Sequence, residues 1–489
     1  MATQSTNRAP SASGIPVAGG RVLPTLNVDG SRRWLRPRPA PGRHWQRRRA
    51  VAYALMLLFL SIPYIHFRGR PLVLLDLPRR EFTLVGTTFL PTDTLLLMLL
   101  LLSIVVSIFL LTALFGRVWC GWGCPQTVYM EFLFRPIERL VEGGRSGSLA
   151  MDREGRHFHP RRLLKYAIYF ALSLFLAHTF LAYFVGVEQL ATWVRRSPFD
   201  HPTSFLVMAG TTALIFFDFT YFREQTCIVA CPYGRWQSVL LDRQSLIVAY
   251  DYERGEPRTK GRVQAADAGD CIDCGACVQT CPTGIDIRDG LQMECIHCTQ
   301  CADACDEIMR RVDRPEGLIR YTTQDALQGG RSGWLRPRVV LYPVALLLFL
   351  GAFTWAIVSR ADAEVTLLRG IGAPFAQGVD GLVSNQVRVK VVNRSRESHD
   401  YQITVEGAPG ASVIAPENPL RVAAGGMATT SIFVLLPPSA FTHGERAVVV
   451  RVDDGAGFSH STNWRLAGPS TSTVPAATEP DGNNTRGGS

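Results

Sequence analysis

Twelve cysteines carry the most specific chemistry in this sequence, and all of them lie between positions 120 and 305. Eight of them form two matching runs. One run extends from Cys271 to Cys281 and the other from Cys295 to Cys305, each with the spacing C-x2-C-x2-C-x3-C. Thiolates are soft ligands that hold iron–sulfur clusters, and this spacing is that of a bacterial two-cluster ferredoxin. The sequence therefore predicts two [4Fe–4S] clusters.

The order of the cysteines also predicts which ones share a cluster. In two-cluster modules the fourth cysteine of each run binds the other cluster. The predicted ligands of the first cluster are Cys271, Cys274, Cys277 and Cys305, and those of the second are Cys295, Cys298, Cys301 and Cys281. Structural zinc and disulfides are the alternatives, but zinc sites use two C-x2-C pairs, whereas here the eight cysteines form two four-cysteine runs. Pro282 follows the first run but Asp306 follows the second, so the second run lacks the usual proline.

Four further cysteines form two C-x3-C-P motifs, Cys120/Cys124 and Cys227/Cys231. If each motif is locally helical, positions i and i+4 place both sulfurs on one face, and the proline after the second cysteine should break or start a helix. Each motif follows an even-numbered apolar segment, so all four thiols are predicted at one membrane depth. They are candidate catalytic and metal-binding residues. They could hold a third [4Fe–4S] cluster or Cu(I), or cycle between dithiol and disulfide.

The elements that position these cysteines are predicted to be membrane-embedded. The chain has 489 residues, of which 47% are hydrophobic and only 19% are charged, which is typical of a membrane protein with soluble parts. Five apolar spans are predicted, at Ala50–Phe67, Thr94–Leu114, Tyr166–Val187, Pro202–Phe222 and Val339–Val358. The net charge of +10 does not indicate nucleic-acid binding, because the Lys and Arg residues cluster beside these spans, as the positive-inside rule requires.

Charge and cysteine chemistry together predict the orientation and the domains. Cluster-forming thiols need a reducing compartment, and the most basic segments belong in the cytoplasm. We predict a multi-pass protein of the bacterial inner membrane with a cytoplasmic N-terminus and Cys-rich region. The predicted parts are a disordered basic cytoplasmic arm (1–49), a four-helix membrane region (50–222), the second C-x3-C-P motif with a linker (223–265), a dicluster ferredoxin domain of α+β class (266–315), a linker (316–338), a fifth membrane helix (339–358), a β domain (361–468) and a disordered tail (469–489).

The segment 361–468 has a different residue pattern from the rest of the chain. Apolar and polar residues alternate at period two in Gln386–Val392, Tyr401–Val405 and Ala447–Val452, and glycines, prolines and asparagines separate such runs. Several short strands at this spacing predict an all-β immunoglobulin-like sandwich, which five spans would place in the periplasm. It has no cysteine, so an inter-sheet disulfide is impossible.

The remaining candidates rank lower. Asp218 lies at the edge of a span, where an acid is either functional or hydrated. His297 and Trp119 stand beside predicted ligands and could tune them. Lone membrane histidines such as His66 and His178 more often form hydrogen bonds than bind haem. No Walker loop or Gly-rich dinucleotide fingerprint accompanies a strand, so we expect electrons to come from a cytoplasmic protein or a quinol.

The combined motifs resemble those of the CcoG/FixG/RdxA family of accessory proteins for cbb(3)-type cytochrome oxidase. The resemblance covers about residues 45–468 and rests on the two C-x3-C-P motifs, the double cluster run closed by Cys305-Asp-Glu-Ile-Met309, the fifth span and the β domain. It implies a polyferredoxin-like inner-membrane protein with two [4Fe–4S] clusters and an Ig-like periplasmic domain. It also implies reduction of Cu(II) to Cu(I) for the copper centre of the oxidase.

Three functions are compatible with these observations. The first is a cupric reductase in which electrons reach the C-x3-C-P thiols through the clusters. Its expected partners are the lipid bilayer, an electron donor, and copper-handling proteins or subunits of a cbb(3)-type oxidase. The second is a quinol-linked electron conduit, which would not need the β domain. The third is a non-enzymatic assembly scaffold that senses redox state.

Overall fold

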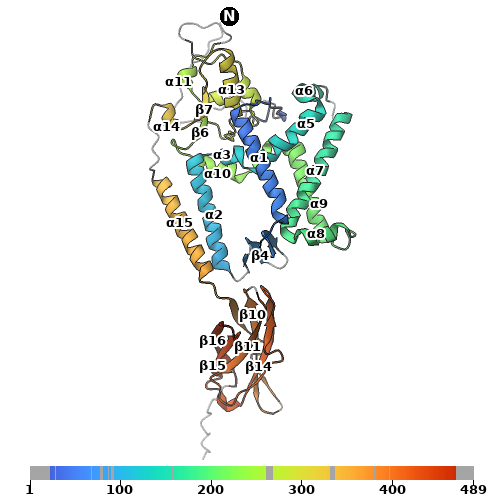
Figure 1. Cartoon of the computed structure of the whole chain (residues 1–489), viewed down its shortest axis with the longest axis vertical. Helices are drawn as coiled ribbons and strands as arrows, with labels where there is room; N and C mark the ends of the chain where they lie inside the picture. The colour runs from blue at the N-terminus through green and yellow to red at the C-terminus, as the bar shows by residue number, and fades with distance from the viewer. Residues whose placement is uncertain are drawn as a thin grey trace, which may run out of the picture. The chain divides into compact units, whose positions relative to one another are not determined.

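The computed structural model of the chain contains two compact units, Met1–Thr354 and Trp355–Ser489 (Figure 1). It describes residues 23–27, 29–67, 69–77, 81–85, 87–89, 93–155, 158–259, 268–330, 336–378, 380–395 and 397–469. The predicted disordered tail therefore lies outside the described residues except for Pro469, as do the first 22 residues of the predicted arm.

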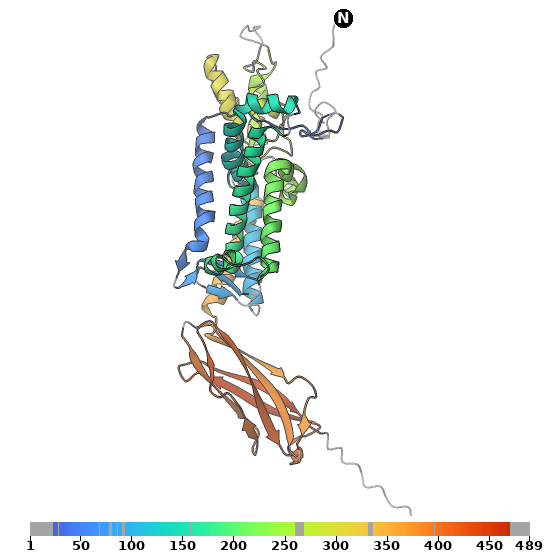
Figure 2. The ribbon, with the colours of Figure 1, turned by 90° about the vertical axis from the view of Figure 1, so that its right-hand side faces the viewer.

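Four described helices are long and apolar enough to cross a membrane, and they agree closely with the predicted spans. They are α2 (Thr94–Phe115), α7 (Pro160–Val185), α9 (Pro202–Phe217) with its π-helical continuation to Phe222, and α15 (Pro337–Val358). Helices α2, α7 and α9 run along one common direction (Figures 1 and 2). Helix α15 packs on α2 through a ring contact between Tyr342 and Phe109.

The first predicted span differs from the structure in its bounds and its composition. Helix α1 covers Arg43–Ser61, not Ala50–Phe67, and a 3-10 turn at Ile62–Tyr64 follows it. His66 and Phe67 form β1 and pair with β2 (Arg70–Pro71). Four arginines in the first seven residues of α1 exclude it from the set of uniformly apolar helices. The basic cluster that we assigned to a membrane flank is therefore inside the helix.

The N-terminal arm is not disordered over its described part, which corrects the prediction for residues 23–49. We call residues 23–42 the N-terminal strap. Its Leu35 is only 5% exposed. Its Arg38 backbone N–H donates to the carbonyl of Gln279 at 2.9 Å, and the Thr280 hydroxyl donates to the Arg38 carbonyl at 2.7 Å. The strap is ordered because its backbone and its arginines find partners that its composition does not reveal.

Short elements connect the long helices. Between α1 and α2 lies a three-stranded antiparallel sheet of β3 (Val73–Asp76), β4 (Glu81–Leu84) and β5 (Thr87–Phe89). Between α2 and α7 follow α3 (Val118–Trp122), α4 (Pro125–Tyr129), the π-helical turn η3 (Met130–Phe134), α5 (Arg135–Glu142) and α6 (Gly144–Arg153). After α7 come α8 (Val187–Val194), α9, the π-helical turn η5 (Thr226–Ala230) and α10 (Pro232–Leu240).

The ferredoxin module is an α+β unit, as predicted, but its strands lie outside the predicted segment 266–315. Strand β6 (Ile247–Tyr250) pairs antiparallel with β7 (Ile319–Thr322). The sequence between them carries α11 (Tyr252–Gly255), α12 (Ala276–Thr280), the 3-10 turn η6 (Ile287–Asp289) and α13 (Gln300–Arg311), and α14 (Gln324–Leu327) follows β7. The core joins buried apolar side chains from β6, β7 and α13 to cysteines of both runs.

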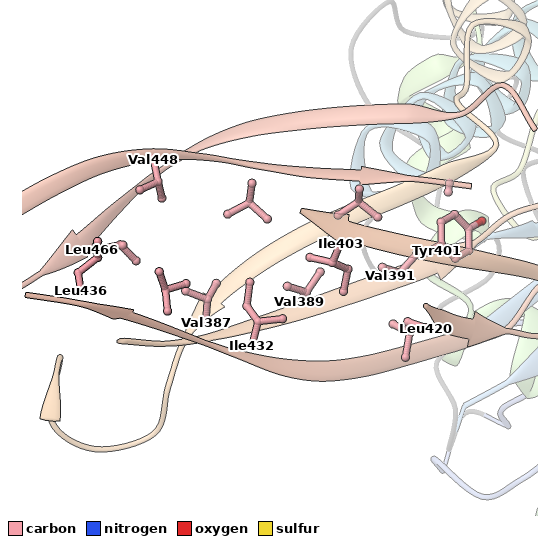
Figure 3. Packing of buried hydrophobic residues seen from close by; sticks show 14 of the residues in the cluster. Val387, Val389, Val391, Tyr401, Ile403, Leu420, Ile432, Leu436, Val448 and Leu466 are labelled. Atoms are coloured by element: carbon pink, nitrogen blue, oxygen red, sulfur yellow. The ribbon is translucent and has the colours of Figure 1, made fainter. Parts of the chain in front are cut away.

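The second unit contains the predicted immunoglobulin-like sandwich. One sheet has the order β12-β14-β10-β8, with β9 paired to β10, and the other has the order β13-β11-β15-β16. The strands are β8 (Ala363–Arg369), β9 (Ala376–Gln377), β10 (Val383–Asn393), β11 (His399–Glu406), β12 (Ser412–Ile414), β13 (Leu420–Val422), β14 (Met427–Leu436), β15 (Glu445–Asp453) and β16 (Ser459–Ala467). Alternate residues such as Val387, Val389, Ile403 and Ile432 fill the core (Figure 3).

Candidate metal centre

Five cysteines line one pocket of the ferredoxin module. They are Cys277, Cys281, Cys295, Cys298 and Cys301, and about 340 Å³ of space, including space open to solvent, is free of protein atoms there. Its other walls are mostly apolar and include Val248, Ile285 and Ile287. All four predicted ligands of the second cluster therefore surround one space. A thiolate-lined, apolar cavity fits a [4Fe–4S] cluster, which takes one cysteine on each iron.

The other predicted set is also brought together. Burial raises the pKa of Cys305, and the neighbouring sulfurs of Cys277, Cys274 and Cys271 raise it further. The sulfur of Cys305 thus lies beside the three cysteines of the other run, in the crossed arrangement typical of two-cluster ferredoxins. Cys274 is the one exposed cysteine among the twelve. The first set therefore has an edge that solvent and a partner can reach.

Equivalent backbone turns position the two runs. Asp273 and His297, which stand just before the second cysteine of each run, both have positive φ, at 51° and 54°. Gly275 and Thr299, which stand just after that cysteine, also have positive φ, at 67° and 58°. A left-handed residue reverses the chain sharply, so each C-x2-C-x2-C segment winds around its space instead of continuing as a helix.

The C-x3-C-P motifs have a local structure that the sequence did not predict. Cys120 lies in α3, but Cys124 has extended backbone and Pro125 starts α4. Cys227 lies in the π-helical turn η5, and extended Cys231 precedes Pro232, which starts α10. The paired sulfurs are therefore not on one face of one helix. The expectation that each proline breaks or starts a helix is confirmed.

The four thiols nevertheless gather in one place. Burial raises the pKa of Cys227 to about 12, and Cys124, Cys120 and Cys231 raise it further in that order. Cys124 is affected in turn by Cys231. We call these four residues the four-thiol group. It is built from the segments that follow two separate membrane helices, α2 and α9.

The four-thiol group touches the second cluster site directly. Cys120 packs against Ile296 and Cys298. A Cβ on Gly121 would lie 2.9 Å from the backbone nitrogen of Cys298 and 2.6 Å from the carbonyl oxygen of Ile296. Only glycine permits this approach, because any side chain would strike backbone. The two groups of thiols are thus in van der Waals contact through Cys120 and Gly121.

Three hydrogen bonds fix this contact. The Arg117 backbone N–H donates to His297 Nδ1 at 3.1 Å, so this imidazole ties the second cysteine run to the start of α3. Trp122 Nε1 donates to the Tyr321 hydroxyl at 2.9 Å, and that hydroxyl donates to the His297 carbonyl at 2.8 Å. His297 is therefore a positioning residue. The sequence suggested a role beside the ligands for His297 but gave no sign of these partners.

Among the described residues, no three His, Cys, Asp or Glu side chains converge closely enough to hold one metal ion. Ligands of a cubane bind separate irons and surround a space instead of a point. Cys120 Sγ has a polar neighbour in the Gln237 side chain, at 3.8 Å.

A buried ion network underlies the site, and the sequence analysis missed it. Glu138 accepts from both terminal nitrogens of Arg223 at 3.1 Å and also pairs with Arg36 of the strap at 2.5 Å and with Lys165 at 3.3 Å. These side chains come from four separate segments, and each is at most 7% exposed. The sequence does not reveal the network, because its members are far apart in the chain and each one resembles an ordinary surface charge.

Comparisons with known proteins give matches along most of the chain. Family models described as a 4Fe–4S dicluster domain, a 4Fe–4S binding domain and the Ig-like fold at the C-terminus of FixG match residues 222–324, 97–142 and 353–469. The chain is 30% identical over 491 residues to the nitrogen fixation protein FixG of Rhizobium meliloti, covering 89% of this chain and 93% of that protein.

Two proteins of Cereibacter sphaeroides are also similar. RdxA is 35% identical over 369 residues, which cover 72% of this chain and 78% of RdxA. RdxB is 36% identical over 375 residues, which cover 71% of this chain and 77% of RdxB. The model that matches residues 97–142 includes Cys120 and Cys124.

Proposed function

Because the chain belongs to the FixG family of iron–sulfur electron-transfer proteins, we propose that it reduces Cu(II) to Cu(I) for the copper centre of a cbb(3)-type oxidase. The observation that carries the proposal is the contact of the four-thiol group with the second cluster site at Gly121 and Cys298. A soft thiolate set next to an electron carrier favours Cu(I) over Cu(II).

Residues of both cysteine runs supply the electron-carrying part of this function. Cys271, Cys274, Cys277 and Cys305 would hold one [4Fe–4S] cluster, and Cys281, Cys295, Cys298 and Cys301 would hold the other. When bound, each cluster stores one electron. Exposed Cys274 marks the side from which a cytoplasmic or quinol-linked donor supplies that electron. Each Cu(II) takes up one electron and becomes Cu(I).

The four-thiol group has two possible occupants within this proposal. It holds either the copper substrate or a third [4Fe–4S] cluster that passes its electron to copper nearby. The iron–sulfur model that matches residues 97–142 supports the cluster. The thiophilic character of Cu(I) supports copper. Metal counting distinguishes the two.

We also propose the orientation. The inner membrane would hold the strap and both cysteine groups on the cytoplasmic side, where thiols stay reduced, and the β domain would lie in the periplasm. The expected partners are copper-handling proteins or subunits of a cbb(3)-type oxidase.

The test is cupric reduction by anaerobically purified protein with a low-potential reductant, read with a Cu(I)-specific chelator. A Cys120→Ser/Cys124→Ser double variant should lose more than about tenfold of the rate and keep about eight irons per chain, two cubanes' worth. Wild-type protein with about eight irons and bound copper would assign copper to the four-thiol group, and about twelve irons would assign a third cluster. Full activity in the double variant would contradict the proposal.

A further inference from the structure

Arg48 is a fully buried charge in the described part of the chain, and two of its three guanidinium nitrogens have no hydrogen-bond partner. It lies in α1, its side chain is fully buried (0% exposed), and its Nε donates to the Gly121 carbonyl at 2.8 Å. Its other two nitrogens are buried and have no hydrogen-bond partner among the described residues. Glu131 lies near enough for the charge of Arg48 to lower its pKa, but buried guanidinium donors without hydrogen-bond partners are costly. The two free amino groups of Arg48 therefore point to a negative group that the protein atoms alone do not provide.

The neighbours of Arg48 show where that negative group lies. Gly121 follows Cys120 and presses against Cys298. Arg48 thus stands at the junction of the four-thiol group and the second cluster site. One face of its guanidinium packs over the Phe132 ring at 5.4 Å.

The nearby protein acid does not satisfy Arg48. Glu131 forms its ion pair with Arg135 and accepts from the Gln300 side chain at 3.1 Å. The Tyr321 hydroxyl is also occupied on both sides, by Trp122 and His297. Arg117 is buried at the same junction but differs from Arg48, because the Arg117 guanidinium donates to the Met293 carbonyl.

We propose that Arg48 is the fixed cation of the second [4Fe–4S] site, with its two free amino groups facing the thiolates that include Cys298. This rests on the proposed function only in requiring that Cys281, Cys295, Cys298 and Cys301 hold a cluster. A cubane with four thiolates is an anion, and uptake of one electron adds one negative charge. A positive charge at this junction, in a medium of low dielectric, stabilises the reduced form. Arg48 therefore raises the reduction potential of the site that contacts Cys120.

The test measures the reduction potential and not the copper reaction. The variant is Arg48→Gln in the full-length protein, and the matched control is Arg47→Gln, which removes the same charge from the exposed neighbouring position. The readout is an anaerobic potentiometric titration followed by EPR. A Cys298→Ser variant identifies the signal of the second cluster through its altered g values.

We expect Arg48→Gln to lower the one-electron equilibrium constant for reduction of that signal at least tenfold, which is a fall of 59 mV. Arg47→Gln should change this equilibrium constant less than about threefold, because solvent screens an exposed charge. If Arg48→Gln does not retain iron, Arg48→Lys decides the matter, since it keeps the charge but not the planar fork. Its constant should stay within about threefold of wild type.

Two results would overturn the inference. One is an Arg48→Gln potential equal to that of Arg47→Gln. The other applies if only the lysine variant holds iron. In that case a tenfold fall of the equilibrium constant for reduction in Arg48→Lys would show that packing and not charge matters. Neither depends on copper. A protein that fails to reduce Cu(II) but shows the shift would refute the proposed function and leave the role of Arg48 intact.

Discussion

Glu138 is a buried carboxylate that stays charged because basic side chains surround it. Burial alone would raise its pKa, but the attraction of Arg223, Arg36 and Lys165 outweighs burial and holds the pKa well below the usual value of a carboxyl group. Removing one member of such a network leaves the others buried without a partner, which costs more than the network contributes as a whole. The network also joins the strap, α5, α7 and the segment after α9. Its loss should therefore make the segment that carries η5 and Cys227 less rigid.

We therefore predict that Glu138→Gln destabilises the folded protein by about 3–5 kcal/mol at neutral pH. Because the folded-state pKa is depressed, the contribution of Glu138 is complete above its unfolded pKa of about 4.3 and is lost as the pH falls toward the folded value. The melting temperature of wild type in detergent should accordingly drop on acidification below about pH 5, and the gap between wild type and variant should narrow there.

The control for this prediction is Glu307→Gln. Glu307 pairs with Arg311 one turn away on the exposed face of α13, and such surface pairs contribute about 0.3–0.5 kcal/mol. Its melting temperature should stay close to wild type at every pH. A Glu138→Gln protein that melts like the Glu307→Gln protein would show that the buried network contributes no stability.

At the residue scale, the sequence was informative where spacing carries the chemistry. The C-x2-C-x2-C-x3-C runs indicate the cluster ligands because the turn geometry of each run is local. Arg48 and Glu138 could not be recognised in the same way. Their meaning depends on partners about 70 to 85 residues away, Gly121 and Arg223, and an arginine beside an apolar segment looks like a membrane flank until its surroundings are known.

At the scale of elements, the strap is the main departure from prediction. Its composition indicates disorder, yet Leu35 packs into the module so closely that a Cβ on Gly284 would lie 2.8 Å from it. Gly284 belongs to the turn that follows Cys281. The strap thus covers the turn that presents a ligand of the second cluster site. The four long apolar helices, by contrast, were predictable from hydropathy, because long apolar runs leave few alternatives.

We predict that Leu35→Asp exposes the second cluster site to solvent. The buried carboxylate has no partner, so the strap should detach from the Cys281–Gly284 turn. The purified protein should lose its iron-dependent absorbance in air several-fold faster than wild type. Removal of residues 1–22, which leaves the strap intact, is the control and should not change the rate. Equal bleaching of the Leu35→Asp and wild-type proteins would mean that the strap does not shield the cluster.

At the scale of the whole molecule, the two compact units should respond to damage separately. Val450 is 1% exposed in the core of the sandwich. Val450→Asp buries an unpaired carboxylate there and should unfold the β domain, seen as rapid proteolysis of the region after α15. The EPR spectrum of the clusters should not change. Asn463→Asp on the exposed side of β16 is the control and should leave both units folded. Loss of the cluster signals in Val450→Asp would show that the units are interdependent.

The number of membrane crossings follows from connectivity more firmly than from hydropathy. The Asp303 carboxylate accepts the backbone N–H groups of His44 and Trp45, which fixes the start of α1 at the ferredoxin helix α13. Helix α2 ends beside Cys120, so its start at Thr94 lies at the opposite end of the bundle. Helix α1 runs from the ferredoxin module toward the other end of the bundle (Figures 1 and 2), and we predict that it is a fifth crossing. Its 19 residues extend about 28 Å, and the uncharged part that would lie in the hydrocarbon core is residues 50–61.

Counting α1 gives five crossings, which would place the strap and the β domain on opposite sides of the membrane. We predict that alkaline phosphatase, which is active only outside the cytoplasm, is active when fused after Gly69 or Gly468 and inactive when fused after Gly155. A fluorescent protein that folds only in the cytoplasm should show the reverse pattern. If α1 does not cross, a reporter at the N-terminus of the full-length chain and the fusion after Gly69 must report the same compartment, because α1 is the only long helix between them in the described part of the chain. An active phosphatase after Gly155 would place the cysteines outside the reducing compartment, where their thiols would not persist to hold iron.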